Sequence, residues 1–293
     1  MKKKEKKYIA PNECSGRRWI GVLAAGLLIG YAMMLPLALL SMNLTGSFLG
    51  VNYGVIIEIL GFMPMFVSLA LAIKFAGKTS MKDFILGAGK SLNKKECLTI
   101  LAMCVVGFAI GNLSDPSNIH LRGVNAGDFA GLVLIMLLLT WMQTTWEELV
   151  FRGIILRWVC KNEIGFNKKS ILASVITSVL FALAHANNPE VTSLQGMERI
   201  VMVCVYAIPG MAYFLANLYF GNLMPGIIMH WVNNFLLFTL ISGEVSAIAA
   251  PTLLVATGSH NAYGMLAGTL LSNLPLAAYI LFDILKKKKA AAA

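Results

Sequence analysis

Long apolar runs constrain the fold of this chain more than any other feature of its sequence. Each run approaches the roughly 20 mostly apolar residues that a helix needs to cross a bilayer. Their bounds are roughly 19–42, 51–76, 97–113, 128–150, 170–187, 199–220, 223–242 and 262–285. Charged residues make up only 13% of the chain, whereas about a quarter of a soluble domain is charged. We therefore predict an all-α, polytopic membrane helix bundle with about eight transmembrane helices.

The polar segments indicate one membrane domain with basic ends. Residues 1–18 form a basic N-terminus, and residues 19–285 form a single transmembrane domain. Residues 286–293 are a basic tail that closes on four alanines, which look like a cloning remnant. The charged segment 80–95 predicts an amphipathic connector at the membrane surface. The apolar stretch 245–258 is short for a span and predicts a re-entrant or surface segment.

Lysine and arginine predict the orientation of the bundle. The segments 1–18, 77–96, 152–169 and 286–289 hold 21 of the 24 basic residues. Because basic loops stay in the cytoplasm, both termini are predicted to be cytoplasmic, which requires an even number of spans. We expect a multi-pass protein of the cell membrane in a bacterial setting, with the lipid bilayer as a partner. The basic residues flank apolar runs and no Gly-rich phosphate loop occurs, so we expect no nucleic-acid partner.

A charged pair inside the fourth run marks the candidate site. No charged residue lies between Asp128 and Glu147, and Glu147 is followed directly by Glu148 and then by Arg152. An acidic residue near the centre of a membrane helix costs about 3 kcal/mol. Two acidic residues in succession are therefore a strong indication of function.

Two other runs carry a histidine with a partner four residues away, on one helix face. These pairs are Phe181 with His185, and His230 with Asn234. The two remaining histidines fall in predicted outer loops, where we expect ordinary surface residues: His120 and His260.

The heights of these residues along their helices were compared at the helical rise of about 1.5 Å per residue. Glu147 and His185 lie about 21 and 24 Å from the predicted cytoplasmic turn between their helices. His230 lies only about 12 Å from the turn before its helix. The three residues meet if that turn is sunk in the protein, or if the helix of Glu147 continues into the cytoplasm.

Each cluster also has a structural explanation. Glu148 and Arg152 can form a buried ion pair, a single histidine can serve packing, and Asn234 can join helices by a hydrogen bond. A diacid, two histidines and an amide on three helices nevertheless favour a reaction centre. Glu58 and Asn217 lie in other apolar runs that contain no comparable cluster of ionisable residues, and we predict structural roles for them.

Together the three motifs resemble the CPBP family of intramembrane proteases, also called the Abi or CAAX-protease-like family. The family pattern is EExxxR, then FxxxH, then HxxxN, on separate helices. Here the pattern is Glu147-Glu148-xxx-Arg152, Phe181-xxx-His185 and His230-xxx-Asn234. The resemblance covers roughly residues 128–240. It implies an intramembrane endopeptidase that cleaves a membrane-associated or prenylated, CAAX-like protein, or a bacteriocin or signal peptide.

The residues suit peptide hydrolysis. The reaction needs an activated water, donors for the oxyanion and a proton for the leaving amine. We expect Glu147 to act as the base and His185 to help hold or deprotonate the water. We expect His230 and Asn234 to donate hydrogen bonds to the oxyanion. The predicted supporting residues are Glu148, Arg152 and Phe181.

Three alternatives stay open from the sequence. Glu147, His185 and His230 could bind Zn²⁺ and leave a fourth position for water, whereas the glutamate mechanism requires no cofactor. Intramembrane Glu and His also build proton relays in transporters, although the runs show no inverted repeat. A catalytically silent bacteriocin-immunity or scaffold protein would bind a peptide without cutting it.

Overall fold

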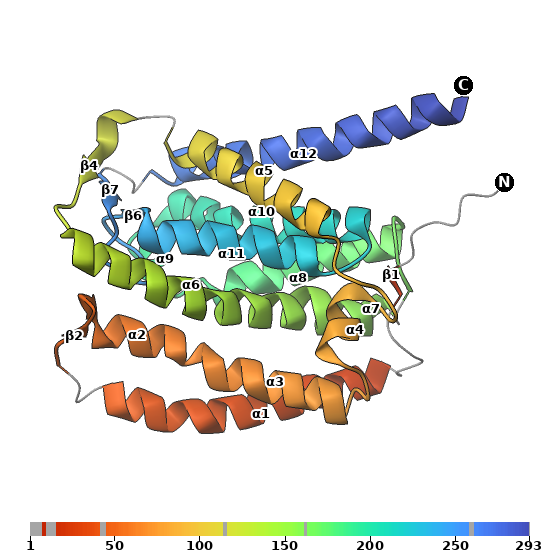
Figure 1. The fold of residues 1–293 in the computed structure, drawn as a ribbon, viewed down its shortest axis with the longest axis horizontal. Helices are drawn as coiled ribbons and strands as arrows, with labels where there is room; N and C mark the ends of the chain where they lie inside the picture. Colours follow the sequence, from red (N-terminus) through yellow and green to blue (C-terminus); the bar gives the residue numbers. More distant parts are fainter. Residues whose placement is uncertain are drawn as a thin grey trace.

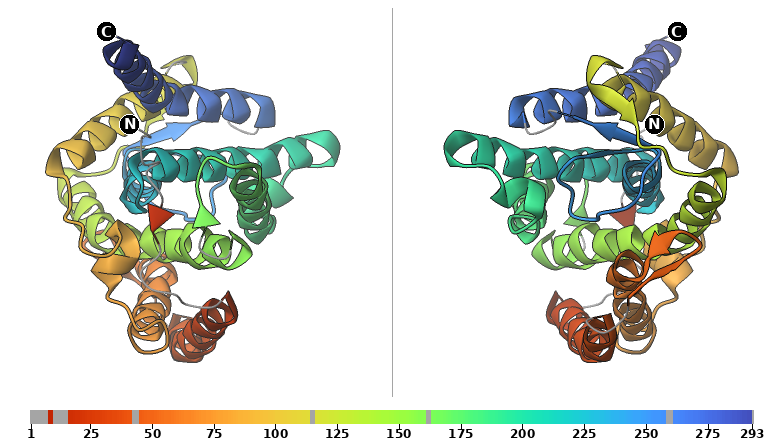
Figure 2. Two further views of the ribbon diagram at one scale, coloured as in Figure 1. Left: turned by 90° about the vertical axis from the view of Figure 1, so that its right-hand side faces the viewer. Right: turned by 90° about the vertical axis from the view of Figure 1, so that its left-hand side faces the viewer.

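The chain folds into a bundle of helices that run side by side, with short strands confined to the ends of the bundle (Figure 1). The computed structural model describes residues 8–9, 16–41, 45–113, 116–160, 163–257 and 261–292. Most of the predicted basic N-terminus and His260 lie outside these residues. Figure 2 shows α1 to α3 on one side of the bundle and α5 with α12 on the other. The helices α6, α8, α10 and α11 lie between them.

The helices follow the predicted apolar runs. The longer ones are α1 (Gly16–Ser41), α2 (Tyr53–Leu60), α3 (Phe62–Phe75), α5 (Lys94–Asn112), α6 (Ala126–Glu148), α8 (Lys168–Ala184), α10 (Gly196–Phe220), α11 (Met224–Thr239) and α12 (Ala262–Ala292). The shorter ones are α4 (Met81–Leu86), α7 (Leu156–Cys160), α9 (Pro189–Thr192), the 3-10 turn η1 (Pro116–Asn118) and the π-helix η2 (Leu149–Ile155).

The strands form three small sheets. In the first two sheets the strands pair antiparallel: β1 (Tyr8–Ile9) with β5 (Glu163–Ile164), and β2 (Ser47–Phe48) with β3 (Val51–Asn52). The third sheet contains β4 (Ile119–Leu121), β6 (Ile241–Gly243) and β7 (Leu254–Ala256) in the order β4-β7-β6. Its strand β7 is antiparallel to β4 and parallel to β6.

The prediction of an all-α membrane bundle is confirmed. Within the described ranges, six helices are long and apolar enough to cross a membrane: Arg18–Pro36, Tyr53–Phe75, Lys94–Asn112, Ala126–Cys160, Gly196–Phe220 and Ala262–Lys287. The two other predicted runs form α8, with 17 residues, and α11, with 16 residues. The count of eight spans and the cytoplasmic termini stay predictions.

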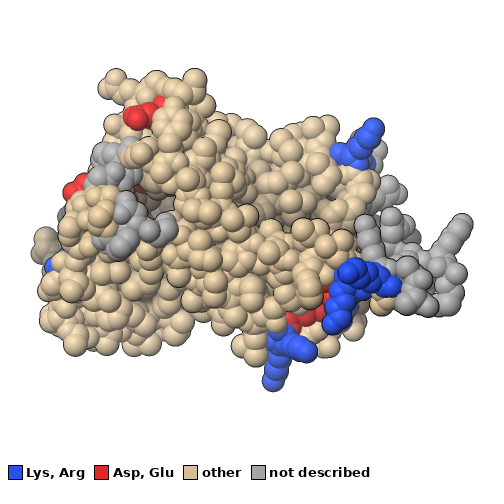
Figure 3. Space-filling model, turned by 90° about the horizontal axis from the view of Figure 1, so that it is seen from above, with Lys and Arg blue, Asp and Glu red and all other residues tan. Residues whose placement is uncertain are grey.

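Charged side chains lie at the ends of the bundle. Figure 1 places α4, the start of α5 and the end of α12 at one end, and β2, β4 and β6 at the other. Seen from above, an uncharged belt separates the charged residues at the two ends (Figure 3). The described parts of the segments with a basic bias therefore lie toward one end of the molecule.

The two segments predicted to lie outside the spans both contact the bundle. The connector 80–95 contains the short helix α4, whose residues Phe84, Ile85 and Leu86 are buried while Lys82 is exposed. The stretch 245–258 begins as a loop with buried Ile248 and then forms β7.

The helices α5 and α12 pack closely through small residues. A Cβ atom added at Gly107 would lie 1.9 Å from the carbonyl oxygen of Ser272, and one at Gly111 would lie 2.0 Å from its Oγ. On α12, a Cβ at Gly268 would lie 2.6 Å from the carbonyl oxygen of Gly111. Small residues spaced four apart let membrane helices approach closely. These glycines therefore set the distance between the two helices.

We expect Gly107→Ala to lower the free energy of unfolding by about 1–3 kcal/mol, the usual cost of overpacking. The obstacle is a backbone oxygen, so the helices must separate to admit the methyl group. The matched control is Gly21→Ala on α1, where an added Cβ meets nothing within 4 Å. Unfolding in detergent measures both variants, and equal stability would show that α5 and α12 do not pack this way.

Candidate active site

Glu147 and Glu148 lie where α6 widens into the π-helix η2. π-helical turns are rare and frequently occur at functional sites. Both carboxylates are buried, with 5% of Glu147 and none of Glu148 exposed, and Arg152 on η2 is 1% exposed. Arg152 donates from Nη1 to Glu148 Oε1 over 2.8 Å. The predicted pairing of these two residues is therefore present as a buried ion pair.

His230 on α11 bridges the two glutamates. Its Nδ1 lies 3.0 Å from Oε1 of Glu148, and its Nε2 lies 3.4 Å from Oε2 of Glu147. The other oxygen of Glu147 accepts a long contact from Gln143 Nε2, at 3.5 Å. Both ring nitrogens of His230 thus face carboxylate oxygens, and α11 is joined to α6 through its only histidine.

The cluster is electrically neutral when it holds one shared proton. Two carboxylates contribute two negative charges, and Arg152 contributes one positive charge. One proton shared by His230 and the glutamates balances the remainder. A buried net charge is costly, so neutrality is the arrangement with the smallest desolvation cost.

The turn before α11 accounts for the height of His230. Leu223 is fully buried and its backbone N–H donates to the carbonyl oxygen of Ile85 over 2.9 Å. Lys90 also donates from Nζ to the carbonyl oxygen of Gly221, at 3.2 Å. The turn is therefore buried beneath α4 and its connector, which fulfils the first condition named for the meeting of Glu147 and His230. The helix of Glu147 also continues through η2 into α7.

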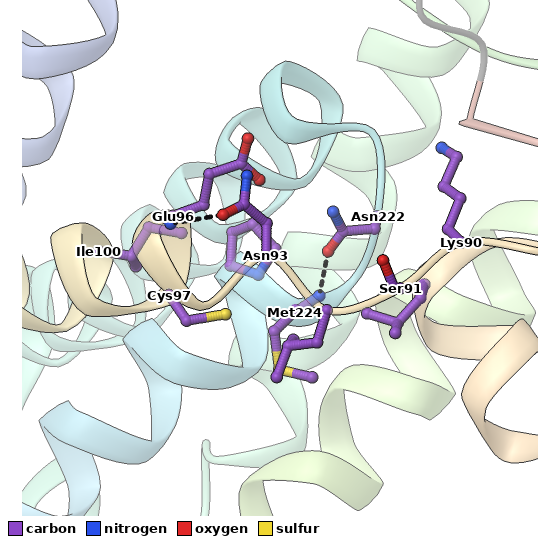
Figure 4. Close-up of a pocket in the computed structure, with 11 residues that line it drawn as sticks. Lys90, Ser91, Asn93, Glu96, Cys97, Ile100, Asn222 and Met224 are labelled. Atoms are coloured by element: carbon purple, nitrogen blue, oxygen red, sulfur yellow. Dashed lines mark hydrogen bonds between the residues drawn. The ribbon is translucent and has the colours of Figure 1, made fainter.

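A small pocket of about 40 Å³ lies beside this turn, against the start of α5 (Figure 4). Asn222 accepts there from the backbone N–H of Met224 at 2.9 Å, and Asn93 caps α5 by accepting from Glu96 at 3.3 Å. None of the predicted site residues lines this pocket. Its residues fix the start of α11 and stand apart from the candidate chemistry.

Two glycines bring α10 and α11 against the charged cluster. A Cβ at Gly226 on α11 would lie 3.0 Å from Glu148 Oε2, and one at Gly210 on α10 would lie 2.4 Å from Arg152 Nη2. Asn217 accepts from the backbone N–H of Gly226 at 2.7 Å, so it joins α10 to α11. This contact agrees with the structural role predicted for Asn217. The sequence did not predict these two glycines as site residues, because a glycine in an apolar run does not indicate which residues of other helices it contacts.

His185 ends α8 and faces the same region. Its Nδ1 contacts the carbonyl oxygen of Phe181 at 2.7 Å. A carbonyl only accepts, so Nδ1 carries the hydrogen and the neutral ring keeps a lone pair on Nε2. The ring of Phe181 lies 4.5 Å from that of His185 and 5.6 Å from that of His230, between centroids. Phe181 thus separates the two histidines.

Two tyrosines of α10 lie under the histidines. Tyr206 stacks on His185 with centroids 4.6 Å apart and ring planes 20° from parallel. Tyr213 stacks on His230 with centroids 5.2 Å apart and planes at 27°. Neither tyrosine was predicted, because aromatic residues in an apolar run are normally read as core.

One cavity of about 900 Å³ connects the predicted catalytic residues. Its wall includes Glu147, His185, His230 and Asn234. Asn234 accepts from the neighbouring Asn233 Nδ2 at 3.3 Å. Glu148 and Arg152 are not part of the wall and lie behind it. The sequence thus predicted four residues that do share one cavity and two that support them from behind.

The remaining predicted residues stand apart from this cluster. His120 on β4 is exposed and contacts Thr257 Oγ1 at 3.1 Å. Glu58 lines a distant part of the cavity wall. Among the described residues, no group of three His, Cys, Asp or Glu side chains is placed to share a metal ion. Glu147, His185 and His230, as they stand, do not form the predicted alternative zinc site.

We expect Arg152→Met to lower the free energy of unfolding by about 3–5 kcal/mol, since it leaves Glu148 buried without its cation. The double variant Arg152→Met/Glu148→Gln should recover much of that loss. The control is Lys287→Met, which breaks the i,i+4 ion pair between Lys287 and Asp283. The side chain of Lys287 is 57% exposed. Exposed pairs contribute about 0–1 kcal/mol. Equal losses in the two single variants, measured by unfolding in detergent, would contradict the burial argument.

Comparison with known proteins agrees with this geometry. Residues 129–236 match the family model described as Type II CAAX prenyl endopeptidase Rce1-like. A search among curated proteins finds no match for the chain. The matched segment contains every residue of the three motifs and nearly coincides with the predicted range 128–240. The resemblance to the CAAX-protease-like family is therefore confirmed: residues 129–236 of this membrane chain match the model of the Rce1-like type II CAAX prenyl endopeptidases.

Proposed function

We propose that this protein is an intramembrane endopeptidase that hydrolyses a peptide bond with a water activated by Glu147. One observation carries the proposal. The carboxylate of Glu147 and the imidazole of His230, 3.4 Å apart, open on a cavity whose wall also holds His185 and Asn234. This set supplies a base, two donors and a second imidazole around one space large enough for an extended peptide.

In the first step Glu147 removes a proton from water, and the oxygen attacks the carbonyl carbon of the substrate. A carboxylate shielded from water is a better proton acceptor than one in bulk solvent. The lone pair on His185 Nε2 accepts the other hydrogen of the water and holds it in place. Glu147 then passes its proton to the nitrogen of the scissile bond, which leaves as an amine. The balance is one water consumed and one amine and one acid formed.

The oxyanion of the intermediate receives hydrogen bonds from His230 and Asn234. The Nδ1 hydrogen of His230 is committed to Glu148, which leaves Nε2 for the substrate. The shared proton of the charged cluster lets Nε2 act as a donor. Loss of one oxyanion donor costs about a hundredfold or more in rate. Glu148 and Arg152 hold the imidazole in this orientation.

The composition of the cavity wall bears on the substrate. The wall is largely apolar, its acidic residues are Glu58, Glu147 and Glu190, and no described lining residue is a lysine or arginine. Such a wall suits an apolar or lipidated peptide in the plane of the membrane better than an anionic one. Within that class, a prenylated CAAX-like protein, a bacteriocin and a signal peptide are the candidate substrates.

We expect Glu147→Gln to reduce cleavage by at least about a hundredfold, because general-base catalysis contributes this much or more. Glutamine keeps the size and polar contacts of the side chain but does not accept the proton. The measurement is the peptide content of membranes from cells that produce the wild type or the variant, followed by cleavage of the identified peptide by purified protein.

The matched control is Glu96→Gln, a glutamate outside the cavity that should leave cleavage unchanged. Identical peptide patterns for wild type and Glu147→Gln, with equal amounts of folded protein, would refute catalysis. A cellular phenotype that survives the substitution would instead support the silent immunity or scaffold function.

A second prediction concerns metal. We expect cleavage to persist after treatment with a strong zinc chelator, because the three candidate ligands are not gathered around one point. Activity of the purified protein before and after chelation provides the measurement. Activity lost on chelation and restored only by Zn²⁺ would replace the glutamate mechanism by a zinc site of Glu147, His185 and His230.

A further inference from the structure

The imidazole of His185 packs against two aromatic rings. Phe181 lies with ring centroids 4.5 Å apart and tilted by 46°, and Tyr206 stacks nearly parallel at 4.6 Å. The contact between Nδ1 and the carbonyl oxygen of Phe181 fixes which edge of the ring faces the cavity. The only ring nitrogen left for the cavity is therefore Nε2.

Tyr206 is itself fixed by polar contacts. Its hydroxyl donates a hydrogen bond to Glu190 Oε1 and accepts one from Asn188 Nδ2 at 3.0 Å. Asn188 also donates to Glu190 Oε1 at 3.3 Å, which closes a triangle of the three side chains. Asn188 and Glu190 belong to the α9 segment, which buried Val191 anchors to the bundle. The hydroxyl is thus committed to α9 and is not a donor for the substrate.

The helix α10 places an aromatic ring under each histidine of the site. Tyr206 and Tyr213 are seven residues apart, so they lie on one helix face about 10 Å from each other. His185 lies at the end of α8 and His230 lies on α11, so the two imidazoles come from different helices. Both imidazoles therefore pack against the same helix, α10.

We propose that Tyr206 is a positioning residue for peptide hydrolysis, which sets the plane of the His185 ring and is held by Glu190 and Asn188. The inference rests on the proposed function, because it assigns His185 to the reaction. Tyr206 acts through His185 and does not touch the reacting atoms. A displaced imidazole lowers the rate of the bound substrate rather than its binding, since misplacement of about 1 Å can cost about a hundredfold.

The test uses two substitutions at one position. We expect Tyr206→Leu, which removes the stacked ring, to lower kcat about tenfold to a hundredfold while KM changes little. Tyr206→Phe keeps the ring and loses only the contact with α9, so it should rescue most of the activity. The control is Tyr219→Leu, on the same helix but paired with Asp283 outside the site, which should cleave like wild type.

A double-mutant cycle separates positioning from a general structural effect. In the background of His185→Ala, the further change Tyr206→Leu should cost nothing more, because residues that act as a unit are not additive. If Tyr206→Leu lowers the rate by the same factor with and without His185, or if Tyr206→Phe is as impaired as Tyr206→Leu, the proposal is overturned.

A spectroscopic readout keeps the inference testable without catalysis. The protein has four histidines, so the ring resonances of His185 can be assigned by their loss in His185→Ala. Stacking on Tyr206 should shift these resonances upfield. They should move downfield in Tyr206→Leu, which keeps only the ring current of Phe181, and stay in place in Tyr206→Phe. Resonances that do not move in Tyr206→Leu would overturn the proposal. If the wild type cleaves no peptide, the proposed function fails, and the resonances alone decide whether Tyr206 sets the ring.

Discussion

The buried charge cluster of Arg152, Glu148, His230 and Glu147 is the interaction on which the rest of the structure depends. Charges removed from water must find partners within the protein, since an unpartnered buried charge is strongly destabilising. Arg152 and both glutamates come from one helical segment, but His230 must be brought from α11. The fold therefore has to bring α11 to the point where α6 becomes η2.

Several features of the bundle follow from that requirement. Gly226 removes the side chain that would separate α11 from Glu148, and Gly210 does the same for α10 at Arg152. The helices that carry the two histidines of the site are the two predicted runs that are shorter than a full span. The start of α11 is buried, and His185 at the end of α8 is half-buried and lines the cavity.

Sequence reasoning identified the charged and ionisable residues because the membrane makes them costly and therefore conspicuous. The spacing of Glu148 and Arg152 on one helix was sufficient to predict their ion pair. The spacing of His230 and Asn234 predicted one helix face, but the estimated height of His230 did not match that of Glu147, because the buried turn at Leu223 is a property of the tertiary fold. The roles of Tyr206 and Gly226 could not be predicted, because aromatic and small residues are common throughout the apolar runs of this chain.

The contact distances divide the cluster into a tightly paired part, Arg152 and Glu148, and a more loosely paired part at Glu147. The distance is 2.8 Å between Arg152 and Glu148, 3.0 Å between Glu148 and His230, and 3.4 Å between His230 and Glu147. The short contacts lie behind the cavity wall, and the longest one opens on the cavity. A water or a substrate carbonyl can enter at this last contact without breaking the ion pair that stabilises the fold. Stability and reactivity can thus coexist because Glu148 is held at 2.8 and 3.0 Å by Arg152 and His230, whereas Glu147 makes only longer contacts, at 3.4 and 3.5 Å.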